Sequence, residues 1–191
     1  MLLVQAKYQL MGLQIVRFMT VGNLEFIKSA TGSSVSSLSV TDCFSAKYDV
    51  YEIIIRNFQS SASTNGNFRF LDSSNAEITS SNYDIAKLNL KSYTSFSEVT
   101  ATNQTLIETG LFTVTSSDGT GELVIRAFNP FDSSDFSFLL IQGAGIRVSS
   151  GLDGYKNIAV LKSAEQCKGF SILADSGTVS LAVSVYGLAS N

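Results

Sequence analysis

Apolar and polar residues alternate in short segments along most of the chain. The alternation is clearest in VSLAVSVY, residues 179–186, where every second residue is Val or Leu. Because successive side chains of a strand point to opposite faces, this period of two predicts strands with one buried face. Similar patterns predict further strands at residues 24–29, 35–40, 48–58, 68–70, 111–115, 122–129, 136–141, 146–148, 157–162 and 170–174.

Turn residues separate these segments. The sequence DSSN at Asp72–Asn75 predicts a hairpin that joins the strand around Arg69 to the following AEITS. The sequence SSDGTG, residues 116–121, predicts a second hairpin between the strands at 111–115 and 122–129. The sequence GAG at 143–145 follows an apolar run and predicts a bulge or a sharp bend.

Signals for helices are weak. Residues 81–93 allow either a short helix, capped by Asn82 and with Ile85 and Leu88 on one face, or a strand. A parallel α/β fold would need helices between its strands, and the sequence does not provide them. About ten short strands joined by polar turns predict an all-β fold, an antiparallel β-sandwich of the jelly-roll type.

The composition favours one folded domain. The chain has 191 residues, of which 45% are hydrophobic and 15% charged, enough apolar residues for a core. We expect residues 1–23 to form an extended N-terminal arm or docking strand and residues 24–191 a single sandwich. The arm is apolar, but Lys7 and Arg17 interrupt it and no basic segment precedes it, which disfavours a signal peptide.

Charge and missing residue types exclude several functions. The net charge is −3 without a basic run, so we expect no nucleic-acid binding, and no apolar run is long enough to span a membrane. The chain has no histidine, which removes Ser-His-Asp and Cys-His catalysis and the commonest metal ligand. Nucleotide-binding motifs are also missing. We therefore expect no enzyme activity and no cofactor.

A few candidate sites stay open. The acidic turns SSDGTGE and NPFDSSD offer oxygens of the kind that calcium prefers, although simple turns explain them as well. Seven tyrosines, including Tyr83, Tyr93 and Tyr155, could stack on sugars, but packing in the core or an interface also accounts for them. Cys43 and Cys167 are expected to be buried free thiols, and a single bridge between them is the alternative.

The segment YDVYEIIIRNF, residues 48–58, carries two charges among isoleucines. Period two places Glu52, Ile54 and Arg56 on one face of a strand, opposite the face that enters the core. A lone apolar residue on a charged face is a candidate for contact with another subunit. We therefore expect Ile54 to contact another subunit. The arm residues Leu13, Ile15 and Phe18 are expected to do the same.

Three segments carry a family resemblance: residues 26–58, 68–86 and 183–188. An I-x-S-A strand, a Ser-rich segment, a YD-x-Y strand, a D-S-S turn and a closing V-x-V-Y-G strand resemble small structural virion proteins of tailed bacteriophages, especially marine ones. These are fibre, baseplate or capsid-decoration proteins. The resemblance implies no catalytic residues.

The resemblance also sets the expected location and partners. It implies a virion protein that assembles on the tail, fibre, baseplate or capsid surface through contacts with itself, as a trimer, and with other virion proteins. The alternative is a β-sandwich module that binds a carbohydrate or a host receptor, such as a surface glycan.

Overall fold

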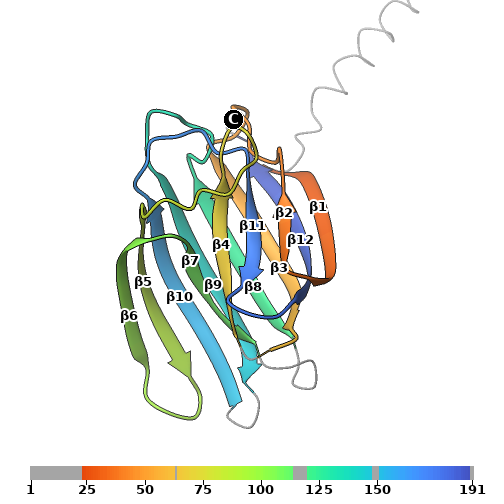
Figure 1. Ribbon diagram of the computed structural model, residues 1–191, viewed down its shortest axis with the longest axis vertical. Helices are drawn as coiled ribbons and strands as arrows, with labels where there is room; N and C mark the ends of the chain where they lie inside the picture. Colours follow the sequence, from red (N-terminus) through yellow and green to blue (C-terminus); the bar gives the residue numbers. More distant parts are fainter. Residues whose placement is uncertain (1–22, 63, 114–119, 148–150, 190–191) are drawn as a thin grey trace, which may run out of the picture.

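The computed structural model describes residues 23–62, 64–113, 120–147 and 151–189. Within these residues all regular secondary structure consists of β-strands. The strands form two antiparallel sheets packed face to face (Figure 1). The predicted all-β antiparallel sandwich is therefore confirmed. The described part of the chain contains no helix that is long and apolar enough to cross a membrane.

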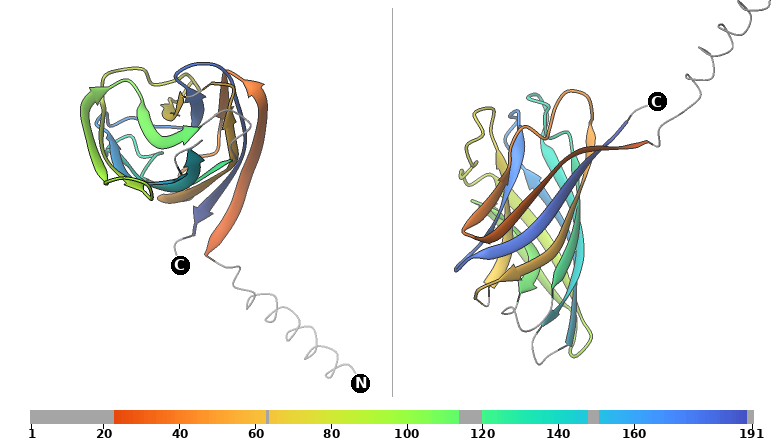
Figure 2. Two further views of the ribbon diagram at one scale, coloured as in Figure 1. Left: turned by 90° about the horizontal axis from the view of Figure 1, so that it is seen from below. Right: turned by 90° about the vertical axis from the view of Figure 1, so that its right-hand side faces the viewer.

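The two sheets differ in width. The larger sheet contains, in spatial order, β1 (Leu24–Val35), β12 (Val179–Leu188), β3 (Val50–Ser60), β8 (Gly121–Phe128), β9 (Ser137–Arg147), β10 (Gly151–Leu161), β5 (Tyr83–Lys91) and β6 (Ser97–Gln104). The smaller sheet contains β2 (Ser37–Val40), β11 (Gly169–Ala174), β4 (Thr64–Leu71) and β7 (Ile107–Thr113). Figure 2 shows that the larger sheet curves around the smaller one.

The strand order is consistent with a jelly roll. The consecutive strands β1 and β2, β3 and β4, β7 and β8, and β11 and β12 each lie in opposite sheets. Without β5, β6, β9 and β10, the eight remaining strands would form two sheets of four. The hairpins β5–β6 and β9–β10 pair with each other through β5 and β10, and they widen only the larger sheet.

Aromatic side chains fill the space between the sheets. The rings of Phe68 and Phe170 stack with their centroids 5.2 Å apart, and Phe70 meets Phe68 edge-on at 5.0 Å. Tyr51 is fully buried, and its hydroxyl group keeps a hydrogen bond there by donating to the Ser45 carbonyl at 2.7 Å. Each fully buried ring contributes about 1.5–3 kcal/mol relative to exposure, so the burial of these rings against the larger sheet helps to hold the layers together.

The structure decides two local predictions. Of the two alternatives for residues 81–93, the strand is the one that forms, because Tyr83–Lys91 is β5. The Asp72–Asn75 turn does form, with the Asn75 N–H donating to the Asp72 carbonyl at 3.0 Å. The chain after it returns to β4 through a single bridge between Leu71 and Glu77, and AEITS does not form a strand.

The second predicted hairpin is wrong, and of the bulge or sharp bend predicted at residues 143–145 the bulge does not form. β7 pairs with β4 in the smaller sheet, whereas β8 pairs with β3 and β9 in the larger one, so the connection between them passes from one layer to the other. β9 runs through its glycines in unbroken register with β10. Gly143 is required there for a different reason: a Cβ would lie 2.5 Å from the Glu122 carbonyl oxygen.

We predict that Phe68→Ala lowers the free energy of unfolding by about 3–5 kcal/mol, because it leaves a cavity in the aromatic cluster. Urea unfolding of the purified chain measures this change. Phe96→Ala is the matched control, since Phe96 is 64% exposed and its truncation should cost less than about 0.5 kcal/mol. Similar losses for the two variants would contradict the assignment of the core.

Candidate interaction surface

The outward face of the larger sheet exposes large apolar side chains. On β8, β9 and β10 the inward residues Leu123, Ile125, Leu139, Ile141 and Ala159 are buried in the core. Alternation then turns their neighbours outward, and Val124, Phe138, Leu140 and Ile158 are 40%, 46%, 47% and 57% exposed. A sheet face that is exposed to water is ordinarily polar, so this face departs from the usual pattern.

The strand register gathers these side chains into one surface. Leu140 lies directly opposite Ile158, and Phe138 lies opposite Val160. Ile54 of β3 lies opposite Val124 of β8, one strand further along the same face. We call these six residues, Ile54, Val124, Phe138, Leu140, Ile158 and Val160, the outer apolar patch. Exposed apolar side chains gathered on one face, here with Arg126 and Gln142 between the members on β8 and β9, mark interaction sites on soluble proteins.

The outer apolar patch is hollowed on both sides of Ile158. A groove of about 740 Å³ has Val124, Leu140 and Ile158 in its wall. A second hollow of about 240 Å³ lies between Ile158, Phe138 and Ala86. Ile158 therefore forms a ridge between two depressions. Apolar side chains of a partner can pack into depressions of this kind.

Several charges beside the patch residues are paired within the sheet, among them that of Arg126, which lies directly opposite Leu140. Arg126 and Glu52 form an ion pair at 3.0 Å, and Lys162 and Asp84 form another at 2.8 Å. The Lys162 ammonium and the Asn103 N–H together lower the pKa of Asp84. Such exposed pairs add little stability, but a partner that docks beside them need not supply an opposite charge.

The predicted subunit contacts fall in two places. Leu13, Ile15 and Phe18 lie outside the described residues. Ile54 is partly exposed on the outward face of β3, between Val124 and Ser184. It is therefore part of the outer apolar patch.

The two charges beside Ile54 have separate partners. Glu52 pairs with Arg126, while Arg56 donates to the Ser184 hydroxyl at 3.2 Å. The face of β3 that the sequence singled out thus continues onto β8.

Sequence reasoning missed the part of the patch on β9 and β10. The sequence pattern predicts only an apolar strand at residues 136–141, although both faces of Phe138–Ile141 are apolar. In an antiparallel sheet, such a run indicates either burial on both faces or an exposed apolar face. The apolar run is therefore visible in the sequence. Its exposed face could be recognised only once β9 was known to lie in the middle of the larger sheet, between β8 and β10.

The acidic turns behave as local caps. Asp132 accepts from the Ser134 N–H at 2.8 Å, and Asp72 accepts from the Ser74 N–H at 2.7 Å. No group of three or more Cys, Asp or Glu side chains in the described ranges is placed to hold a metal ion. Most of the SSDGTGE turn lies outside those ranges. Asp153 does not belong to a turn, because it is a buried residue of β10.

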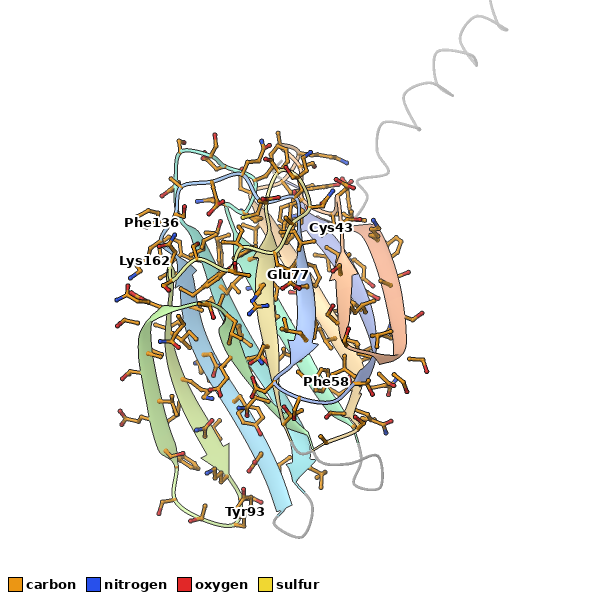
Figure 3. All side chains as sticks on the ribbon, viewed as in Figure 1. Cys43, Phe58, Glu77, Tyr93, Phe136 and Lys162 are labelled. Atoms are coloured by element: carbon orange, nitrogen blue, oxygen red, sulfur yellow. The ribbon has the colours of Figure 1, made fainter. Side chains whose placement is uncertain are left out.

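Two of the three candidate tyrosines belong to the interior. Tyr83 is fully buried, and its hydroxyl donates to the Ile78 carbonyl at 3.1 Å. Tyr155 is also buried, on the inward face of β10. Tyr93 is partly exposed and lies at the tip that joins β5 to β6 (Figure 3). The side chains that would stack on a sugar are thus not gathered on an exposed surface.

Comparison with known proteins gives no family for this chain. No known family model matches the sequence, and no curated protein sequence matches it. The function is therefore argued from the geometry of the described residues and from the resemblance in the sequence.

The two cysteines are free and buried, as expected from the sequence. Cys43 follows β2 and Cys167 precedes the neighbouring strand β11, and the Cys43 N–H donates to the carbonyl of Lys168 at 2.9 Å. Burial raises the pKa of both thiols to about 12. The reactive species of a cysteine is the thiolate, so these side chains are chemically protected in the folded protein.

We predict that neither thiol of the native chain reacts rapidly with Ellman's reagent at pH 8. A thiol with a pKa near 12 is ionised to roughly one part in ten thousand at that pH, and burial also blocks access. After unfolding in urea, both thiols should react fully within the same assay. Fast reaction of either cysteine before unfolding would contradict the buried positions.

Proposed function

We propose that this chain is a non-enzymatic structural subunit that assembles by burying the outer apolar patch against a second copy of itself. Following the resemblance in the sequence, the assembly belongs to the virion of a tailed bacteriophage, on the tail, fibre, baseplate or capsid surface. A trimer is the expected oligomer, with other virion proteins as further partners. The observation that carries the proposal is the patch on β3, β8, β9 and β10.

A second copy is the occupant that the chain's own composition favours. With a charged fraction of only 15%, the chain has few residues that keep a free monomer soluble. Interfaces between identical subunits are more apolar than other interfaces, and they are depleted in charge at their centre. Val124, Leu140 and Ile158 share one groove of the patch, and Arg126, which lies directly opposite Leu140, is already paired with Glu52.

The N-terminal segment adds an electrostatic reason for self-association. Residues 1–22 carry Lys7 and Arg17 and no acidic residue. The segment contributes a charge of +2 to the net charge of −3, so the rest of the chain carries a net charge of −5. Opposite charges on the two parts of one chain favour contact of the segment with a neighbouring copy.

We predict that Ile158→Lys dissociates the oligomer into monomers, because it places a charge on the ridge of the patch. Sedimentation velocity of the full chain over a range of concentrations measures the change. Ile158 is more than half exposed in the isolated subunit, so the variant should unfold within about 0.5 kcal/mol of the parent under conditions where both are monomeric.

Phe96→Lys is the control for this experiment, since it alters an equally large exposed side chain away from the patch. It should leave the sedimentation coefficient unchanged. The proposal fails if the parent chain is monomeric at all concentrations, or if the two lysine variants have the same effect.

We also predict that deletion of Met1–Gly22 leaves a folded sandwich that no longer assembles or joins the particle. The described strands begin at Leu24, so the core does not depend on the deleted residues. Circular dichroism reports the fold, and sedimentation reports the assembly. Assembly that is unchanged after the deletion would show that the arm has no part in it.

The virion part of the proposal has a separate test. Proteomic analysis of purified particles of a phage that encodes this chain should recover it as a particle component. If purified particles lack it, the self-associating module would act outside the virion.

A further inference from the structure

The inward face of β10 and β5 changes from apolar to polar along its length. At one end, Ala159 and Leu161 of β10 face the core together with Tyr83 and Ile85 of β5. Further along, the inward residues are polar and pair across the two strands: Asn157 with Lys87, Tyr155 with Asn89, and Asp153 with Lys91. The hydrophobic core therefore ends partway down this side of the sandwich.

A hollow of about 190 Å³ lies at the polar end. Asn65 and Gly110 line it from the smaller sheet, on β4 and β7. Lys87, Asn89, Lys91, Asp153 and Tyr155 line it from the larger sheet. We call this hollow the polar trough. It lies on the opposite face of the larger sheet from the outer apolar patch.

Contacts between the sheets hold the walls of the polar trough in place. Lys87 forms an ion pair with Glu108 of β7, and the Asn65 amide donates to the same carboxylate at 2.7 Å. The Asn157 amide reaches β7 by donating to the Thr109 carbonyl at 2.6 Å. Donors and acceptors at the trough are thus positioned by the fold, as binding sites require.

The backbone at Gly110 is shaped to fit against Tyr155. Gly110 has a φ of +87°, and a Cβ at this position would lie 2.8 Å from the Tyr155 ring. The tyrosine ring therefore forms a wall of the trough that is closely covered by β7. An amphipathic wall beside amide and charged groups suits a ligand with both C–H and O–H groups.

Buried charge at the trough is costly for folding alone. The side chain of Lys87 is 7% exposed, and Asp153 is 2% exposed. Apolar residues at buried ion pairs often give equal or greater stability, so the polar residues here are not explained by folding energy. A few converging polar groups of this kind are what orients a ligand in a binding pocket.

The charge balance and the size of the trough indicate its ligand. Lys87 and Lys91 are matched by Glu108 and Asp153, so the site offers no net charge to attract an ion. Its volume has room for roughly six water molecules, which is on the scale of one sugar ring. We propose that the polar trough binds a neutral polyhydroxylated ring, such as the terminal monosaccharide of a glycan.

The test is ligand-observed NMR on the full chain with a panel of free sugars: glucose, galactose, mannose and N-acetylglucosamine. Saturation transfer should show saturable binding of at least one sugar at millimolar concentration. Lys91→Gln removes a charged donor from the trough, and it should weaken that binding about tenfold, the effect expected for a hydrogen bond to a charged group. Lys91 is partly exposed, so the variant should fold, and its thermal unfolding checks this.

Lys156→Gln is the matched control. Lys156 lies on β10, next to β5, but its side chain faces outward beside the apolar patch. This variant should bind the sugar like the parent chain. The inference is overturned if no sugar in the panel binds saturably, or if both glutamine variants weaken binding equally. Lys91→Gln should not alter self-association, so the trough and the patch are tested independently.

Discussion

The packing of a four-stranded sheet against an eight-stranded one governs the other features of this molecule. Alternation along each strand of the larger sheet produces two faces, and the smaller sheet with its aromatic residues covers the inward one. Phe68 and Phe170 stack on each other across β4 and β11, so that the smaller sheet presents a continuous aromatic surface to the core. The outward face receives no such cover from the described residues, and yet Leu140 and Ile158 make it apolar. Since exposed apolar surface is unfavourable in water, this mismatch calls for a partner.

The two added hairpins create both candidate surfaces. β9–β10 and β5–β6 extend the larger sheet past the four strands that would complete a jelly roll with the smaller sheet. Their outward residues supply most of the outer apolar patch, including Phe138, Leu140 and Ile158. Their inward residues supply Lys87, Lys91 and Asp153, at the place where the core gives way to the polar trough. The two hairpins thus supply most of the face that we propose for assembly and most of the hollow that we propose for a ligand.

The fold class was predictable from the sequence because period two is a local property, and VSLAVSVY became β12 as expected. The pairing of strands was less predictable. A polar turn such as SSDGTG is compatible with a hairpin and equally with a connection between layers, and only the pairing of β7 with β4 decides between them. Ile54 could be identified because it lies between two charges. Asp153 and Lys91 could not be identified from the sequence as residues of the polar trough. Their place in it depends on the register of β10 with β5, which brings residues that are distant in the sequence side by side.

The central claim is that the outer apolar patch is buried when copies of the chain meet. Hydroxyl-radical footprinting of the full chain, at protein concentrations below and above assembly, measures this burial at individual side chains. We expect oxidation of Phe138, Leu140 and Ile158 to fall on assembly, while Phe96 oxidises at the same rate in both states. Equal oxidation of the three patch residues in the two states would show that the chain assembles through another surface.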